Sequence, residues 1–366
     1  MKRILCIVGS MDAGGAETFL MKLYRSFDKT KYQMDFIVAT TEKGTYDAEI
    51  ESLGGIIYHV SPKSEGFIRN FTAIRQIVKE NHYDIVLRTS QNSLSALELL
   101  AAKMGGANKR IFRSSNSNAS ATSSKQRIIH RMCRFMPILF SNIRIAPSTE
   151  AAEFMFGKHC ISNGKATILK NAVDLDKYRF NLEDREALRR ELGIENNFVI
   201  GHVGRFNEQK NHAFLIDIFS DIKKRKQDAK MLLVGDGELK SDIEKRVEDL
   251  NLKNDVLFLG VRNDVTCLLS AMDALVFPSL FEGMPNVVIE SQAAGLPCYI
   301  SDTITREAKI TDFVTFIPLS FDSSRWAEIV STDVSAYDRT DATLTLEREG
   351  YSIKSVLKEF LQIIGE

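Results

Sequence analysis

Two glutamates, Glu282 and Glu290, lie eight positions apart in the sequence SLFEGMPNVVIESQAAGLP, residues 279–297. The apolar run at residues 274–277 predicts a buried strand that leads into this segment, and the apolar run before Glu290 predicts a helix. Open α/β sheets bind ligands where a strand ends and the next helix begins. Each carboxylate oxygen accepts hydrogen bonds, so two such groups on one rigid element suit a hydroxyl-rich ligand such as a sugar or a ribose.

A second set of chemically competent residues lies in the loop GRFNEQKN, residues 204–211. Arg205 offers a planar fork of donors, and Lys210 offers a compact positive charge. A predicted strand precedes this loop and a predicted helix follows it, so backbone amides at the helix start add donors for a phosphate. The two cations and the amides can together neutralise a diphosphate without a metal ion.

The two motifs together resemble those of retaining nucleotide-sugar glycosyltransferases with the GT-B fold, in particular glycosyltransferase family 4. The context EGMPN before the second glutamate and AAGLP after it makes the match specific, as does the Gly-Arg-x4-Lys-Asn loop. The resemblance covers most of the chain and is strongest over residues 171–302. It implies a GT-B architecture of two Rossmann-like, doubly wound α/β domains that face each other across a cleft.

The same resemblance implies roles for these side chains in a donor site. Glu282 is expected against the donor sugar, Glu290 on the ribose hydroxyls, and Arg205 and Lys210 on the diphosphate, so Glu282, Arg205 and Lys210 are the predicted catalytic residues. Neither glutamate is implied as a displaced nucleophile. In the family the acceptor hydroxyl is thought to attack on the face that the phosphate leaves and to lose its proton to that phosphate.

Glycine-rich turns complete the implied donor site. Gly14-Gly15 follows the first predicted strand, and Gly235-Asp236-Gly237 and Leu259-Gly260-Val261 follow two later ones. The last two turns are equally consistent with tight turns that bind no ligand. The predicted donor-binding residues are Gly14, Gly15, Gly204, Arg205, Lys210, Gly235, Gly237, Gly260, Val261, Glu282, Gly283, Met284, Pro285, Asn286, Val287 and Glu290.

The first half of the chain departs from the family in its acceptor region. Many relatives carry histidines in a segment that here reads RIFRSSN, residues 110–116, and in another that here reads LRTSQN, residues 87–92. Arg113 and Ser115 replace the histidines of the first segment, so a histidine-assisted step is not expected. Four residues are instead predicted to contact the acceptor, which suits a charged one: Arg88, Arg113, Ser115 and Asn116.

Strands and helices alternate twice along the chain, which predicts two parallel, doubly wound sheets. Residues 1–170 are expected to form an acceptor-binding domain, and residues 171–347 a donor-binding domain. Residues 348–366 contain an amphipathic helix that is expected to pack on the first domain, with an ordinary terminal helix of the second domain as the alternative.

Positive charge is concentrated in the first half of the chain. Residues 1–170 carry 24 Lys and Arg against 14 Asp and Glu, and residues 99–149 carry nine basic residues and no acidic one. Within residues 125–145, Arg127, Arg131 and Arg134 follow helical spacing among apolar residues, which is typical of a helix on an anionic membrane. A core helix that has one solvated face and ends at Pro137 is the other interpretation.

Composition excludes several classes of protein. The longest apolar runs are shorter than the ~18 residues that a membrane-spanning helix needs. The five cysteines have no metal-ligand spacing, so we expect reduced thiols in a cytoplasmic protein, peripheral on the inner face of the membrane if the basic helix binds there. No cofactor, metal or nucleic-acid partner is expected. The motif Asp174-Leu175-Asp176 is read as a boundary turn.

These observations predict a metal-independent, retaining glycosyltransferase. The donor is expected to be a UDP-sugar, and the acceptor a glycan or lipid-linked saccharide in capsule, exopolysaccharide or lipopolysaccharide synthesis. Two alternatives stay open: a catalytically inactive, nucleotide-sugar-binding relative that acts as a partner subunit, and a GT-B nucleotide-sugar epimerase. The sequence leaves the donor sugar, the base, the acceptor and the linkage undefined.

Overall fold

The computed structural model describes residues 1–12, 14–63, 65–115, 124–333 and 339–365. The chain forms two compact units. Unit 1 consists of Met1–Ala172 and Tyr351–Glu366, and unit 2 of Val173–Gly350. These divisions lie within two or three residues of the expected ones. No helix of the described segments is both long and apolar enough to cross a membrane.

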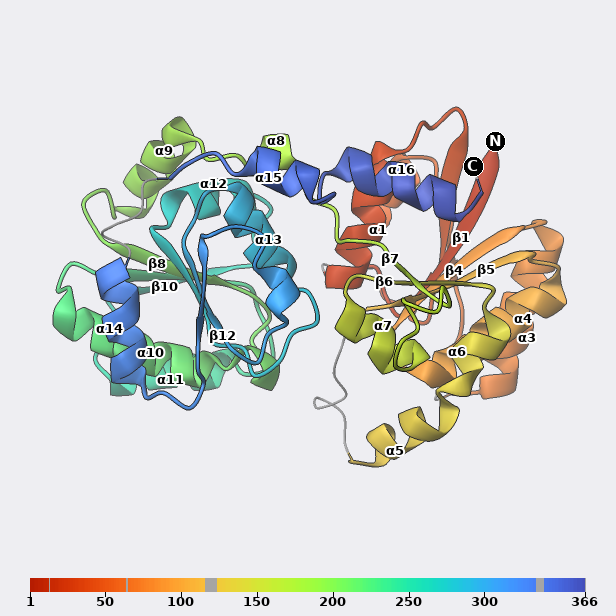
Figure 1. The fold of residues 1–366 in the computed structure, drawn as a ribbon, viewed down its shortest axis with the longest axis horizontal. Helices are drawn as coiled ribbons and strands as arrows, with labels where there is room; N and C mark the ends of the chain where they lie inside the picture. The colour runs from red at the N-terminus through yellow and green to blue at the C-terminus, as the bar shows by residue number, and fades with distance from the viewer. Residues whose placement is uncertain (13, 64, 116–123, 334–338, 366) are drawn as a thin grey trace. The chain divides into compact units, whose positions relative to one another are not determined.

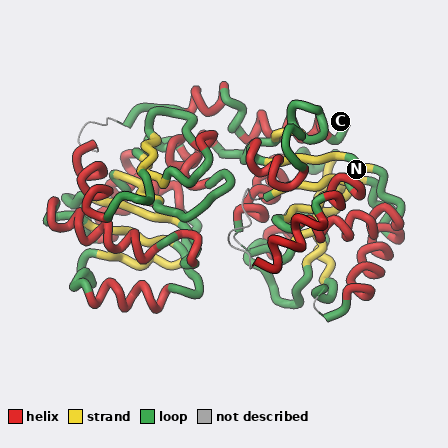
Figure 2. The backbone as a smooth tube through the Cα atoms, turned by 60° about the horizontal axis from the view of Figure 1, so that its bottom comes forward, coloured by secondary structure: helices red, strands yellow, loops and turns green. Residues whose placement is uncertain are grey.

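Unit 1 is built on a parallel sheet with strand order β3-β2-β1-β4-β5-β6-β7. Its strands form the middle layer between helices, as the yellow and red segments of Figure 2 show. The elements are β1 (Lys2–Val8), α1 (Gly15–Ser26), β2 (Tyr32–Val38), α2 (Asp47–Ser52), β3 (Ile57–His59), α3 (Phe67–Glu80), β4 (Ile85–Ser90), the 3-10 helix η1 (Ser93–Ala96), α4 (Leu97–Gly105), β5 (Lys109–Ser114), α5 (Ser124–Cys133), α6 (Phe135–Phe140), β6 (Ile143–Ala146), α7 (Thr149–Phe156), β7 (Thr167–Ile168) and α16 (Ile353–Ile363).

The core of unit 1 has two halves because both faces of its sheet are covered. Strand β1 is buried throughout residues 4–8, as expected for a central parallel strand. Its even-numbered residues join a cluster with α1 and α16, and Leu5 and Ile7 join a cluster with α3, α4 and α7 on the other face. The C-terminal helix α16 lies against α1 (Figure 1), where Phe360 contacts Phe27 with ring centroids 6.2 Å apart.

Unit 2 repeats this plan with a parallel sheet of strand order β10-β9-β8-β11-β12-β13. Helices α10, α11 and α14 cover one face, and α9, α12 and α13 the other (Figure 1). The elements are α8 (Leu175–Tyr178), α9 (Leu182–Leu192), β8 (Val199–Val203), η2 (Glu208–Lys210), α10 (His212–Arg225), β9 (Lys230–Val234), α11 (Lys240–Asp249), β10 (Val256–Gly260), α12 (Val265–Ala271), β11 (Ala274–Phe277), α13 (Asn286–Ala293), β12 (Cys298–Ser301), η3 (Arg306–Ala308), β13 (Val314–Ile317), α14 (Ser323–Asp333) and α15 (Thr343–Arg348). The predicted class of two doubly wound α/β domains is confirmed.

One predicted element is wrong in detail. The expected single basic helix is broken into α5 and α6, with Arg134 between them. Pro137 lies in the first turn of α6 and does not end the preceding helix, because a proline in a first turn loses no intrahelical hydrogen bond. Arg134 donates to the backbone oxygen of Glu153, so it does not share one free helical face with Arg131. The side chain of Arg127 lies outside the described residues.

Candidate active site

The two sequence motifs of unit 2 meet at the centre of its sheet. Strands β8 and β11 are neighbours, and the chain runs outward from β8 through β9 and β10 before it crosses back to β11. The loops that follow β8 and β11 therefore leave the sheet at its topological switch point, where doubly wound sheets bind ligands. Residues 204–211 form the first loop, and residues 278–285 form the second.

Three hydrogen bonds hold these two loops together. The backbone amide of Leu280 donates to the oxygen of Gln209 at 2.8 Å, and the Gln209 side chain donates to the oxygen of Phe281 at 3.0 Å. The Asn211 side chain donates to the oxygen of Pro278 at 3.2 Å. The loops thus form one scaffold, although they lie more than sixty residues apart in the sequence.

This scaffold brings Lys210 and Glu282 together. The Lys210 ammonium donates to Glu282 Oε1 at 2.6 Å, and only 16% and 10% of the two side chains are exposed. The Lys210 Nζ also lies 4.5 Å from the centre of the Phe277 ring, a cation–π distance. Asn207 positions the lysine locally, because its side-chain oxygen accepts from the Lys210 amide and begins the 3-10 turn η2.

The other predicted donor residues of this scaffold lie in the same two loops and on helix α13, which follows the second loop. Helix α13 begins at Asn286 without a side-chain cap and carries Glu290, which is 7% exposed. The first amides of a helix point out of its N-terminus and suit an anion, and α13 begins four residues after Glu282. Arg205 is largely exposed and lies 3.5 Å from Glu238, so the structure does not place it in the Lys210–Glu282 pair.

The glycines of the next turn have a structural reason of their own. A Cβ on Gly235 would lie 2.1 Å from the oxygen of Gly204, and a Cβ on Gly237 would lie 2.5 Å from the oxygen of Phe206. These two turns therefore pack backbone to backbone. Gly260 has φ +66 with open space around it, and Val261 beside it is 63% exposed. Donor binding by these residues stays a prediction.

In unit 1, Gly14 caps the N-terminus of α1, and Glu17 folds back over it. A Cβ on Gly14 would meet Glu17 Oε2 at 2.4 Å, a contact that the end of the flexible glutamate side chain could relieve by moving. Burial raises the pKa of Glu17, and the charges of Arg88 and Arg113 oppose that rise. Contact of Gly14 and Gly15 with a donor stays a prediction.

Both arginines that were predicted to contact the acceptor are engaged within unit 1. Arg113 lies on β5, is 2% exposed, stacks on the Phe19 ring and donates to Asn171 Oδ1 at 2.7 Å. Burial lowers the pKa of Arg113 to about 9, which leaves its guanidinium charged at neutral pH.

Arg88 has internal partners as well. It pairs with Glu98 and donates to the oxygen of Ile7 at 2.9 Å. Ser115 follows β5 directly, and Asn116 lies outside the described residues. Acceptor contact by these four residues stays a prediction, and both arginines already have a structural role.

Sequence reasoning missed a buried histidine pair beneath Lys210. His202 on β8 and His212 at the start of α10 have ring centroids 4.7 Å apart and are 0% and 2% exposed. The two histidines have no metal-ligand spacing in the sequence, and no group of His, Cys, Asp and Glu that could hold a metal ion occurs in the described segments. Their position next to the Gly-Arg-x4-Lys loop was the available signal.

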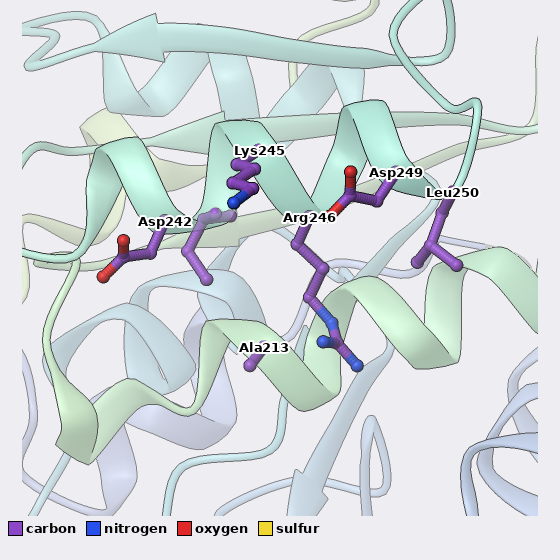
Figure 3. A pocket seen from close by; sticks show the side chains of 7 residues that line it. Ala213, Asp242, Lys245, Arg246, Asp249 and Leu250 are labelled. Atoms are coloured by element: carbon purple, nitrogen blue, oxygen red, sulfur yellow. The ribbon is translucent and has the colours of Figure 1, made fainter.

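A surface hollow elsewhere in unit 2 lacks this chemistry. It lies between α10 and α11, encloses about 390 Å³, and is lined by charged side chains of both signs (Figure 3). Its Arg246 is paired with Asp217 at 2.6 Å. It carries no motif residue, so the loop scaffold after β8 and β11 is the candidate active site.

Comparison with solved structures agrees with the fold. The structure of Anabaena Alr3699/HepE in complex with UDP-glucose matches with a TM-score of 0.80 at 19% sequence identity, covering 100% of this chain and 99% of that one. The two sheets and the order of the strands in each thus define a protein of the GT-B class.

The sequence comparisons establish the family. Residues 13–177 match Glycosyltransferase Family 4, and residues 184–329 match Glycosyl transferases group 1. The Bacillus subtilis (strain 168) protein EpsF, whose name describes it as a glycosyltransferase, is 34% identical over 92% of this chain and 88% of its own. An Escherichia coli UDP-Gal:alpha-D-GlcNAc-diphosphoundecaprenol alpha-1,3-galactosyltransferase is 29% identical over 64% of this chain and 62% of its own. The chain belongs to glycosyltransferase family 4, as its motifs predicted.

Proposed function

We propose that this chain transfers a sugar from a UDP-sugar to a glycan or lipid-linked saccharide in cell-surface polysaccharide synthesis, with retention of the anomeric configuration. The observation that carries the proposal is the Lys210–Glu282 pair at the switch point of unit 2. Support for the substrates comes from the UDP-glucose complex of the Anabaena protein and from the diphosphoundecaprenol acceptor in the name of the Escherichia coli relative.

The proposed reaction divides the work among the site residues. The bond between the anomeric carbon and the donor phosphate breaks, the acceptor oxygen bonds to that carbon from the same face, and the acceptor proton goes to the leaving phosphate. Lys210, Arg205 and the α13 amides stabilise the charge that develops on the diphosphate. Glu282 holds sugar hydroxyls and Glu290 holds the ribose. These cations make the step independent of a metal ion, so turnover should survive EDTA.

Nucleotide binding tests the donor half of this proposal. UDP and UDP-sugars should raise the melting temperature of unit 2, because a ligand at 100 times its Kd adds about 2.7 kcal/mol. Lys210→Met should remove most of the shift, while Lys245→Met, an exposed lysine on α11, should keep it. Absence of a shift with every nucleoside diphosphate would contradict the donor site.

Turnover separates the enzyme from a partner subunit that only binds the donor. An enzyme should release UDP slowly from its donor even without acceptor, whereas an inactive relative should bind the donor and leave it intact. The intact pair of Lys210 and Glu282 favours the enzyme.

We further propose that α5 and α6 contact an anionic membrane, where a lipid-linked acceptor would lie. Met132, Phe135 and Leu139 are 70%, 56% and 62% exposed, Ile138 is exposed beside them, and Arg131 is exposed on α5. Exposed apolar side chains next to a basic one suit the interface of anionic lipids. The interaction rests more on apolar contact than on charge, because Lys109, Arg110, Arg134 and Arg144 donate to backbone oxygens.

Vesicle binding tests the membrane contact. Changing Met132, Phe135 and Leu139 together to serine should abolish sedimentation with phosphatidylglycerol vesicles and leave the UDP-induced shift unchanged. Ile68→Ser, which removes an exposed apolar residue of α3, is the matched control and should have no effect. Equal sedimentation of the triple variant and the control would refute the contact.

A further inference from the structure

A chain of stacked rings lies beneath the candidate site. The His212 ring stacks on Phe206 with centroids 4.2 Å apart, and the His202 ring stacks on Phe277 with centroids 4.9 Å apart. The two histidines meet edge to face. Phe277 in turn lies under the Lys210 ammonium. His202 is therefore one ring away from the lysine of the candidate site.

The hydrogen bonding of His202 fixes which of its nitrogens carries the proton. Its Nδ1 lies 3.0 Å from the backbone oxygen of Val276, which can only accept, so Nδ1 carries the hydrogen. Burial and the neighbouring positive charge of Lys210 keep the pKa of His202 well below its usual value, so the ring is neutral. Nε2 is then a buried acceptor, and it has no hydrogen-bond partner among the described residues.

An unsatisfied buried acceptor is costly, and phenylalanine would fill the same space without that cost. Such an atom in a native protein calls for an explanation, for example a partner that arrives with a ligand. The end of Lys210 is close enough to be that partner. A Cβ on Gly204 would lie 3.1 Å from His202 Nε2 and 3.1 Å from Lys210 Cε, so these two atoms are at most twice that distance apart.

We propose that His202 is a positioning residue whose Nε2 accepts a hydrogen bond from Lys210 when Glu282 turns to a bound donor sugar. This proposal rests on the proposed function and adds the group that holds the lysine in the loaded site. An ammonium group has three donors, so Lys210 can bond His202 and still meet phosphate oxygens. No proton is transferred: Lys210 stays charged and His202 stays neutral.

A double-mutant cycle tests the proposal, with UDP and inorganic pyrophosphate as calorimetric probes. His202→Phe keeps the stacked ring but removes the acceptor, and it should weaken binding about tenfold, since a hydrogen bond to a charged group is lost. His202→Gln should bind nearly as the wild type, because its side-chain oxygen can take the place of Nε2. In a Lys210→Met background, His202→Phe should change Kd less than about twofold.

Two controls keep the outcome clear. His212→Phe preserves the same ring stack and should leave Kd within about twofold of the wild type. If His202→Phe does not fold, His202→Asn serves instead, because it can still donate to Val276 but is too short to reach Lys210.

If His202→Phe weakens binding equally in the wild-type and Lys210→Met backgrounds, the role of His202 is merely structural. Unchanged binding in His202→Phe would also overturn the proposal. If the wild type binds neither probe, the proposed function itself fails and the role of His202 with it.

Discussion

At the scale of single residues, the site is defined by two charges that neutralise each other. A buried ion pair contributes little net stability, because desolvation offsets much of the attraction. Removal of one partner, however, leaves the other charge buried and uncompensated. The Lys210–Glu282 pair therefore gives each of these largely buried side chains an opposite charge as its partner.

His212 gives this site a measurable response to acid. Burial, assisted by the charge of Lys210, lowers the pKa of His212 to about 4, below its ordinary value of 6.5. The unfolded chain therefore binds a proton that the folded protein does not, and the free energy of unfolding should fall by roughly 3 kcal/mol between about pH 6.5 and 4. In His212→Phe this part of the fall should be missing.

The single tryptophan makes this measurement specific to unit 2. Trp326 is the only tryptophan of the chain and is fully buried in the core of unit 2, so its fluorescence follows the unfolding of that unit. Urea titrations at pH 7 and pH 4.5 give the difference. An identical loss of stability in the wild type and in His212→Phe would argue against a neutral, buried imidazole.

At the scale of elements, the site depends on how closely its loops approach each other. The turn at residues 235–237 packs against the backbone of residues 204–206, and the amide of Phe206 donates to the oxygen of Asp236 at 3.0 Å. Only glycine allows that approach, because Gly235 has φ +134 and no room for a Cβ. The two turns thus set the position of the loop that carries Lys210.

Gly235→Ala should therefore displace that loop. The added methyl group collides with the oxygen of Gly204. We therefore expect the free energy of unfolding of unit 2 to fall by about 3 kcal/mol, together with weaker UDP binding. Gly193→Ala, at φ +67 with open space around it, is the control and should cost only about 1 kcal/mol without changing UDP affinity. Equal effects of both changes on UDP affinity would mean that the close approach does not position the loop.

The helices and strands themselves were largely predictable, because the apolar patterns that indicate them are local in the sequence. The strands at residues 274–277 and 231–234, for example, are continuous apolar runs. The break at Arg134 was not predictable, since the pattern of apolar residues continues through it. Nor did the sequence show that Arg110 and Arg144 satisfy backbone oxygens, because such partners are brought close only by the fold.

At the scale of the whole molecule, the chain begins in unit 1, forms unit 2, and ends in unit 1 again. The last helix, α16, completes the core of unit 1 with Val356, Phe360 and Ile364. The amphipathic pattern of this helix was visible in the sequence. Its packing on the first domain was implied by the resemblance alone, and its contact partner α1, more than three hundred residues earlier, was not predicted.

Phe360→Ala should destabilise unit 1 selectively. Loss of a buried aromatic side chain costs about 3–5 kcal/mol. Calorimetry should show an earlier unfolding transition, while the transition reported by Trp326 stays in place. Gln362→Ala, an exposed position of the same helix, should change neither. A parallel drop of both transitions would show that α16 stabilises the two units together.

The central claim is that Lys210 neutralises the leaving diphosphate of a sugar donor. The most direct test is the initial rate of UDP release from the UDP-sugar that stabilises the protein most, with an undecaprenyl-diphosphate-linked saccharide as acceptor. Lys210→Met should lower kcat about 100-fold or more, as expected when one charge-stabilising group is removed from a transition state. Lys245→Met should keep the wild-type rate. Equal rates for Lys210→Met and Lys245→Met would contradict the account.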